Sequence, residues 1–296
     1  MKVFLDPPHP SLALKRVANA LTAHAPSNVE ITSSYKAADF IIFHAIGRLN
    51  SLKAKINSLL KEKKQYAIIQ YALRSTKEPR TQSWISVWSG AKVVWSYYDL
   101  PALISQDHSG WSLIPEIPVF YHAPLGVDST VFFGSGSVKK EYIILTSGGS
   151  WLTEGVREAV HAARRVGGKV AHLGKELGRG EGVHCYNGVG DSTLAYLYRR
   201  SRFVCGLRRK EGFELPAAEG LLCRATPILF DQPHYKQWYG SWAEYIPEGP
   251  RNEVIDSLEA LFRRDTVAID ADQRRKAVEL FDWGKIAIGF WEKCLS

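Results

Sequence analysis

The chain has 296 residues, of which 45% are hydrophobic and 23% are charged, and its formal net charge at pH 7 is +8. This composition is typical of a soluble globular protein of about two domains. No apolar run approaches the roughly 18 residues of a membrane span, and the apolar stretch after Met1 is too short for a signal peptide, so neither is expected. The positive charge favours polyanionic partners: nucleotide diphosphates, nucleic acid or an anionic membrane surface.

The cysteines are few and scattered along the sequence. Cys185, Cys205, Cys223 and Cys294 include no Cys-x-x-Cys pair, so the pattern indicates neither a zinc site nor a disulfide framework. Three of the four lie in apolar surroundings and are expected to be buried. A reducing cytoplasm is the location that fits this pattern best.

Short apolar runs alternate with longer amphipathic segments through the first half of the chain. Apolar residues at helical spacing predict helices, and short apolar runs bounded by polar residues predict strands. The expected strands cover 3–5, 29–31, 40–43, 66–71, 93–95 and 119–122, and the expected helices cover 11–23 and 49–64. Strands that alternate with helices indicate parallel βαβ units.

The second half repeats this alternation after a polar linker, Gly134-Ser135-Gly136-Ser137. Strands are expected at 142–146, 169–173, 203–207 and 227–230, and helices at 153–166, 192–200 and 216–222. We therefore expect an α/β protein with two Rossmann-like doubly wound domains, residues 1–134 and 138–280. A C-terminal helix at about 281–296 would cap the second domain or pack back on the first.

The most informative segment runs from Glu211 to Gly220, between two predicted strands. Pro216 favours a helix start, because proline lacks the N–H that is unsatisfied in a first turn. A helix N-terminus at the loop end of a parallel sheet is suited to phosphorylated ligands, and carboxylates beside it suit ribose hydroxyls. Alternatively, Glu219 is a favourable charge near a helix start, and Glu211 is an exposed loop residue.

Three segments in this order carry a resemblance to a known family. They are His122 to Phe132, then Asn187-Gly188-Val189 followed by Leu194 to Tyr198, and then Glu211 to Glu219, in which seven residues separate two glutamates. In these segments the chain resembles the retaining nucleotide-sugar glycosyltransferases of family 4, whose Glu-x7-Glu motif the third segment matches and whose GT-B fold places two Rossmann-like domains on either side of a cleft. The matches cover about the last 175 residues.

The resemblance implies a role for each residue of the donor site. Glu219 would hold the nucleotide ribose, and Glu211 would lie near the donor sugar as a catalytic residue. The backbone of Gly212, Phe213, Glu214 and Leu215 would face the sugar or its phosphates. A turn after a strand would approach the diphosphate closely, or would be only a tight turn; it comprises Gly148, Gly149 and Ser150, and Asn187 completes the donor-binding set.

The chain departs from the family at two positions that normally carry positive charge. Family members place an arginine and a lysine where this chain has Gly149 and Glu154. The charge that neutralises the leaving diphosphate is then expected from Arg208, Arg209 and Lys210, unless these three form only a solvated basic loop.

A basic group on the first domain would assist the acceptor. His44, at the end of the strand expected at 40–43, is the candidate catalytic residue, although a histidine at a strand end is often a structural hydrogen bonder. Transfer is expected to need no metal and no cofactor other than the donor substrate, a UDP- or GDP-sugar. Catalysis would then depend on positioning and on charge around the diphosphate.

The sequence therefore predicts a hexosyltransferase that moves a sugar with retention to a glycan or another hydroxyl acceptor. Two alternatives remain open at this stage. One is a glucosyltransferase for hydroxymethylpyrimidine bases of DNA, bound through the basic surface. The other is a degenerate module that binds a nucleotide-sugar without catalysis.

Overall fold

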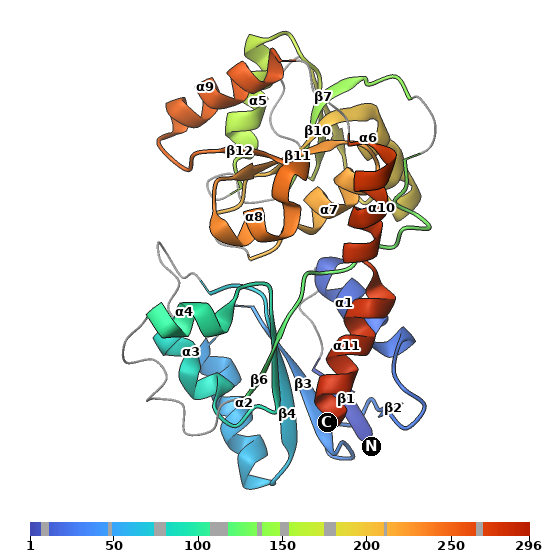
Figure 1. The fold of residues 1–296 in the computed structure, drawn as a ribbon, viewed down its shortest axis with the longest axis vertical. Coiled ribbons are helices and arrows are strands. Elements are labelled where there is room, and N and C mark those ends of the chain that lie inside the picture. Colours follow the sequence, from blue (N-terminus) through green and yellow to red (C-terminus); the bar gives the residue numbers. More distant parts are fainter. Residues whose placement is uncertain are drawn as a thin grey trace. The chain divides into compact units, whose positions relative to one another are not determined.

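The computed structural model describes residues 1–6, 12–46, 49–73, 81–106, 118–134, 138–148, 154–174, 182–209, 212–264 and 269–296. The chain forms two compact units, each built on a six-stranded sheet (Figure 1). The first unit comprises Met1–Gly126, Lys210–Phe213 and Trp283–Ser296, and the second comprises Val127–Arg209 and Glu214–Asp282.

All strand pairs in the first unit are parallel, and the strand order is β2-β1-β3-β4-β5-β6. The strands are β1 (Lys2–Leu5), β2 (Glu30–Ile31), β3 (Phe40–Ala45), β4 (Gln65–Gln70), β5 (Val93–Ser96) and β6 (Val119–His122). Every residue of the central strand β3 is buried, as expected for a parallel sheet that helices cover on both faces.

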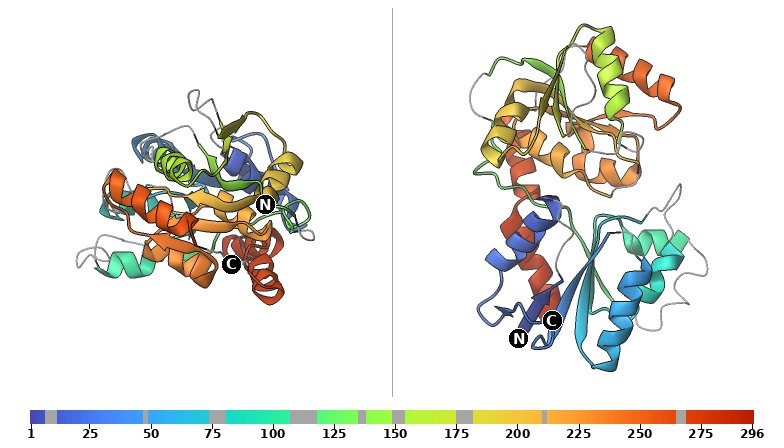
Figure 2. Two further views of the ribbon diagram at one scale, coloured as in Figure 1. Left: turned by 90° about the horizontal axis from the view of Figure 1, so that it is seen from above. Right: turned by 180° about the vertical axis from the view of Figure 1, so that it is seen from behind.

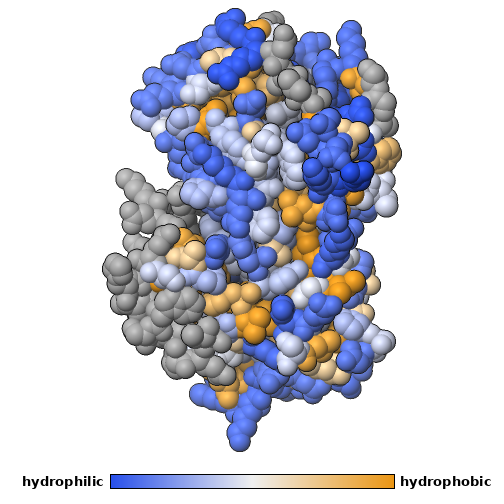
Figure 3. Space-filling view, viewed as in Figure 1, coloured by the Kyte–Doolittle hydropathy of each residue, from blue (hydrophilic) through white to orange (hydrophobic). Residues whose placement is uncertain are grey.

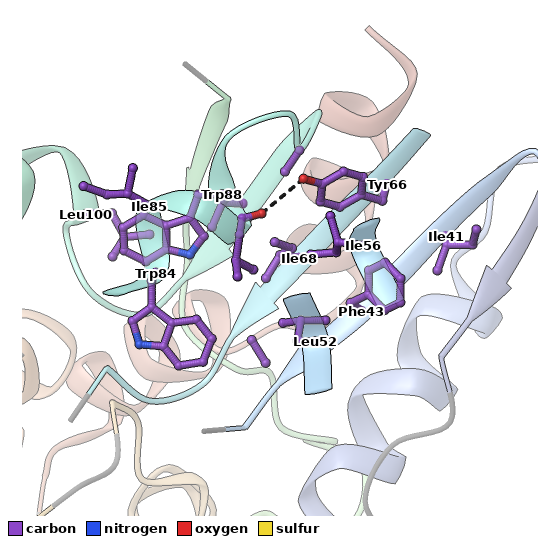
Figure 4. Close-up of a cluster of buried hydrophobic side chains, with 14 of the residues drawn as sticks. Ile41, Phe43, Leu52, Ile56, Tyr66, Ile68, Trp84, Ile85, Trp88 and Leu100 are labelled. Carbon is purple, nitrogen blue, oxygen red and sulfur yellow. Dashed lines mark hydrogen bonds between the residues drawn. The ribbon is translucent and has the colours of Figure 1, made fainter. Parts of the chain in front are cut away.

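Helices cover the two faces of this sheet as separate groups. They are α1 (Leu12–Ala23), α2 (Leu49–Lys61), α3 (Thr81–Trp88), α4 (Leu100–Gln106) and α11 (Trp283–Leu295). Figure 2 shows α2, α3 and α4 on one face and α1 with α11 on the other. Figure 4 shows the apolar core beneath α2 and α3, where the hydroxyl of Tyr66 donates to the carbonyl of Val87 at 3.2 Å.

The C-terminal helix α11 belongs to the first unit, although it is the last element of the chain. Its Phe290 ring lies 5.3 Å from the Trp95 ring, between centroids. The indole Nε1 of Trp291 donates to the carbonyl of Leu21 in α1 at 3.0 Å. Phe290 and Trp291 are fully buried, so α11 completes the core on this face of the sheet.

The sheet of the second unit is also parallel throughout, with the order β12-β11-β10-β7-β8-β9. This is the Rossmann order, in which the first strand of the unit lies beside the fourth and the direction of winding reverses between them. The strands are β7 (Tyr142–Ser147), β8 (Val170–Leu173), β9 (Val183–Tyr186), β10 (Ser201–Gly206), β11 (Thr226–Phe230) and β12 (Glu244–Ile246).

The helices of the second unit also form two groups. They are α5 (Val156–Arg165), α6 (Asp191–Arg200), α7 (Leu215–Leu222), α8 (Pro233–Tyr239), α9 (Arg251–Phe262) and α10 (Ala271–Leu280). α5 packs with α9 over one hydrophobic core, while α7 contacts α6 and α10. Gly220 lets α7 lie close to the sheet, since a Cβ there would be only 2.6 Å from Val204 Cγ1 of β10.

The structure confirms the prediction of two Rossmann-like doubly wound sheets. Among the described residues, the elements not individually expected from the sequence are α3, α4, β9, α8, β12, α9 and α10, together with a 3-10 turn at Gly240–Trp242. Ser135, Gly136 and Ser137 of the predicted linker lie outside the described residues.

In the part of the chain that the structure describes, no helix is both long enough and apolar enough to cross a membrane. On the face drawn in Figure 3, hydrophobic residues occur in small groups among polar ones.

Candidate functional site

The point where the winding of the second sheet reverses lies between β7 and β10, and ligands of α/β proteins bind at the carboxyl ends of such strands. β7 ends at Ser147 and β10 ends at Gly206. Two residues further along the chain from β10 comes Arg208, which is 7% exposed. The carboxyl edge of the sheet therefore carries a buried cation at its reversal point.

Three groups hold the Arg208 guanidinium in place. Its Nη2 donates to the carbonyl of Ser147 at 3.0 Å. Its Nη1 lies 2.5 Å from Glu154 Oε1, and its Nε lies 3.5 Å from Glu214 Oε2. Two carboxylates thus surround one guanidinium, and the expected role of Arg208 in neutralising a diphosphate stays a prediction.

Gly148 directly follows β7 and has a positive φ of 123°. A side chain there would be strained, and its Cβ would overlap Glu154 Oε2 and lie 2.7 Å from Arg208 Nη1. The Glu154–Arg208 ion pair therefore lies directly against the Gly148 backbone. Gly149 and Ser150, the other residues of the predicted turn, lie outside the described residues.

Arg209 also contacts carboxylates. Its Nη2 lies 3.6 Å from Glu158 Oε1, its Nε lies 3.8 Å from Glu248 Oε1, and its guanidinium carbon lies 4.8 Å from the centroid of the Phe230 ring. Both described arginines of the predicted basic loop are therefore ion-paired and not simply solvated. Lys210 lies outside the described residues.

Helix α7 begins at Leu215 with Pro216 in its first turn, as the sequence predicts. Glu219 lies beyond the first turn and is 2% exposed. Its Oε2 accepts a hydrogen bond of 3.1 Å from the hydroxyl of Tyr198 in α6. Glu219 is therefore a buried, hydrogen-bonded carboxylate. It is not a charge at the helix start, because the first turn of α7 contains no acidic residue.

Three more residues of the predicted site lie in the second unit: Glu214 just before α7, Leu215 at its start, and Asn187 just after β9. Glu214 is 1% exposed, and its carbonyl accepts a hydrogen bond of 2.6 Å from the Tyr239 hydroxyl. Leu215 is buried. Asn187 directly follows β9 and is exposed, so it lies at the same carboxyl edge of the sheet as Gly148.

One polar pair at this edge was not predicted from the sequence. His172 of β8 is fully buried, and its Nδ1 lies 2.9 Å from Thr146 Oγ1 of β7. Burial lowers the pKa of His172 to about 4, so the imidazole is neutral at pH 7. Its Nε2 has no hydrogen-bond partner among the described residues. The signal that could have revealed it was a histidine among the apolar residues of the strand predicted at 169–173.

In the first unit, β3 extends to Ala45, so His44 lies within the strand and the predicted strand end at residue 43 is wrong. The extra residues pair with Ile69 and Gln70 of β4. The His44 Nδ1 lies 2.8 Å from the Tyr71 hydroxyl. Burial lowers the pKa of His44 to about 4, and its Nε2 has no hydrogen-bond partner within the described parts of the chain.

Gly212 and Phe213 belong to the first unit and lie beside Tyr71 and Tyr97. The Gly212 amide donates to the carbonyl of Tyr71 at 3.3 Å. The Phe213 ring lies 5.6 Å from the Tyr97 ring, which itself lies 5.8 Å from the Tyr71 ring. The structure thus brings together His44, Gly212 and Phe213 in one unit, and Gly148, Arg208 and Glu214 in the other. Glu211 lies outside the described residues.

No group of three or more His, Cys, Asp or Glu side chains within the described ranges is arranged to hold a metal ion. The sequence contains one Asp-x-Asp segment, Asp270-Ala271-Asp272. There Asp270 caps α10 by accepting the Gln273 amide at 2.7 Å. Asp272 lies 3.0 Å from Lys276 Nζ and also pairs with Arg275. Both carboxylates therefore have local roles at the start of this helix.

No protein-family model matches the sequence, and no curated protein matches it significantly. Three solved structures are similar in fold. Anabaena HepE in complex with UDP has a TM-score of 0.70 at 13% identity, over 99% of both chains. Sucrose-phosphate synthase from Thermosynechococcus elongatus has a TM-score of 0.61 at 12% identity, over 95% of this chain and 76% of that one.

The pneumococcal O-GlcNAc transferase GtfA, solved with UDP and GlcNAc, has a TM-score of 0.60 at 12% identity. The match covers 96% of this chain but only 59% of GtfA, so the chain spans about three fifths of that protein. At this identity the likeness establishes the fold, which is the GT-B type with two Rossmann-like domains.

Proposed function

We propose that the chain is a retaining glycosyltransferase that moves a sugar from a nucleoside-diphosphate sugar to a glycan or another hydroxyl acceptor. The observation that carries the proposal is the buried Arg208 beside Gly148, at the reversal point of a Rossmann sheet. Proteins of the same fold have been solved with UDP, and HepE also with UDP and glucose. These likenesses support a UDP-sugar as the donor.

Arg208 would neutralise charge on the departing diphosphate. A guanidinium presents several N–H donors in a rigid plane, which suits phosphate oxygens. The adjacent glycine lets a phosphate approach the backbone without meeting a side chain. Stabilising charge that develops on a leaving group is usually the largest contribution to this kind of catalysis. Glu219 would accept hydrogen bonds from the ribose hydroxyls.

His44 would act on the acceptor from the first unit. Since its imidazole is neutral at pH 7, one ring nitrogen is a donor and the other an acceptor. In the tautomer whose Nδ1–H donates to the Tyr71 hydroxyl, Nε2 is the acceptor and would receive the proton of an acceptor hydroxyl. The acceptor itself would be a glycan or another hydroxyl compound, as the sequence analysis predicts.

The donor is tested by thermal unfolding in the presence of UDP, UDP-glucose, UDP-GlcNAc and GDP. A ligand at about one hundred times its dissociation constant should stabilise the protein by about 2.7 kcal/mol. Release of UDP from the sugar nucleotide, with and without candidate glycans, then separates a transferase from a binding module. If no nucleotide shifts the unfolding temperature of the wild type or of any of its site variants, the proposal is wrong.

A further inference from the structure

The charge balance around Arg208 is unusual for a site that would bind a diphosphate. Glu154 and Glu214 both contact this one guanidinium. Their side chains are 17% and 1% exposed, so water screens them only in part.

The position of the Glu154 carboxylate is the second observation. Its Oε2 lies in the space that a Cβ of Gly148 would enter, and its Oε1 lies 2.5 Å from Arg208 Nη1. One carboxylate therefore lies with one oxygen, Oε2, against the glycine at the end of β7 and the other, Oε1, in contact with the buried arginine. A phosphate oxygen of a bound donor would require the same two contacts, a glycine backbone and a guanidinium.

We infer that Glu154 occupies the place of a donor phosphate oxygen, so that the nucleotide must displace this carboxylate from Arg208 in order to bind. The inference rests on the proposed function, since it assigns Glu154 as an internal competitor at the same site. Glu154 directly precedes Gly155, which has a φ of 57° and lies just before α5. Displacement of the Glu154 carboxylate would free Arg208 Nη1 from this ion pair, while Ser147 and Glu214 still contact the rest of the guanidinium.

The test is the affinity for UDP, measured by calorimetry on the full chain and its variants. Glu154→Gln removes the competing charge, and we expect UDP to bind about tenfold more tightly, the change that corresponds to loss of one partly buried ion pair. Glu154→Asp, which withdraws the carboxylate by one methylene, should give a smaller gain. Glu154→Lys should bind UDP at least as tightly as Glu154→Gln.

A matched control is available at the opposite edge of the same sheet. Glu141 precedes β7 and pairs with Arg200, so Glu141→Gln removes a similar ion pair far along the strand from Arg208. Its affinity for UDP should equal that of the wild type. In the double variant Glu154→Gln/Arg208→Gln, the gain in UDP affinity should vanish when it is measured against Arg208→Gln alone, because the carboxylate acts through Arg208.

Unchanged or weaker UDP binding by Glu154→Gln overturns the inference, and would show that Glu154 positions Arg208 for the donor. A gain that persists in the double variant overturns it as well. Failure of the wild type and every variant to bind UDP or a UDP-sugar instead contradicts the proposed function. Binding by Glu154→Gln when the wild type shows none supports both.

Discussion

Two buried histidines link the stability of the molecule to pH. His44 and His172 lie in different units, and burial lowers the pKa of each to about 4. Each unfolded side chain has a pKa near 6.5, so between pH 6.5 and 4 the unfolded chain binds more protons than the folded one. The stabilising contribution is complete above pH 6.5 and is lost as the pH falls through this range.

We therefore expect the free energy of unfolding to fall by on the order of 3 kcal/mol per histidine between pH 7 and pH 4. Chemical denaturation across this range, followed by a probe in each unit, measures the loss. His172→Asn cannot titrate there and should reduce the pH dependence of the second unit. A variant profile parallel to that of the wild type would contradict the assignment.

Glu219 gives a second prediction at the scale of one residue. Glu219→Ala should abolish UDP binding, because it removes the proposed ribose acceptor. It should also destabilise the second unit by about 1–3 kcal/mol, because the buried Tyr198 hydroxyl loses this hydrogen bond. Tyr198→Phe is the control, since it removes the hydrogen bond and keeps the carboxylate. Thermal unfolding with and without UDP measures both effects. Full UDP binding by Glu219→Ala would exclude this role.

At the scale of elements, the spacing of apolar residues predicted the central strands well, but it missed several short helices and edge strands. Strands β3 and β10 contain the apolar runs 40–43 and 203–205, because helices cover both faces of a parallel sheet. β9 lies at the sheet edge with two of its four residues exposed, so it has no such run. α3 has only eight residues, which leaves little room for a helical period to be recognised.

The structural placement of the candidate site residues was predictable only where one segment carried them. The sequence placed Pro216 at the start of α7 and Glu219 within that helix from the motif itself. It could not show that Glu154 meets Arg208, because these residues are far apart in the chain and are joined only by the pairing of β7 with β10. The burial of His172 against Thr146 likewise depends on the register of β7 and β8.

The contact between α7 and β10 supports a prediction about the helix. Gly220→Ala would improve helix propensity by about 1 kcal/mol. The new Cβ, however, would lie 2.6 Å from Val204 Cγ1 and 3.0 Å from Val204 Cβ, and overpacking of this kind costs about 1–3 kcal/mol. We expect net destabilisation of the second unit, measured by its unfolding temperature. Gly190→Ala, where a Cβ meets nothing within 4 Å, is the control, and equal effects would contradict the argument.

At the scale of the whole molecule, the positive charge is unevenly divided. The first unit has 17 Lys and Arg against 10 Asp and Glu, and the second has 21 against 20. Helix α2 contains lysines and no acidic residue. The basic character that favours a polyanionic partner therefore belongs to the first unit, whereas the proposed donor site lies in a nearly neutral unit.

This division predicts different responses to two charge reversals. Lys53→Glu/Lys61→Glu in α2 should lower the salt concentration at which the protein leaves a heparin column, and should leave UDP affinity unchanged. Arg275→Glu/Lys276→Glu in α10 changes the net charge equally, but those residues already pair with Asp272, so its effect should be smaller. Equal effects would show that only total charge matters.

The placement of α11 also sets an order for folding on the ribosome. The second unit is nearly continuous in sequence. The first unit needs residues 283–296, because Phe290 covers Trp95 and Trp291 donates a hydrogen bond to the carbonyl of Leu21. The part of the chain that is translated first therefore waits for the last helix before its sheet is covered on both faces. Until then its apolar surface is open to chaperones, and a transcript cut short after the second unit would yield one finished domain attached to an incomplete one.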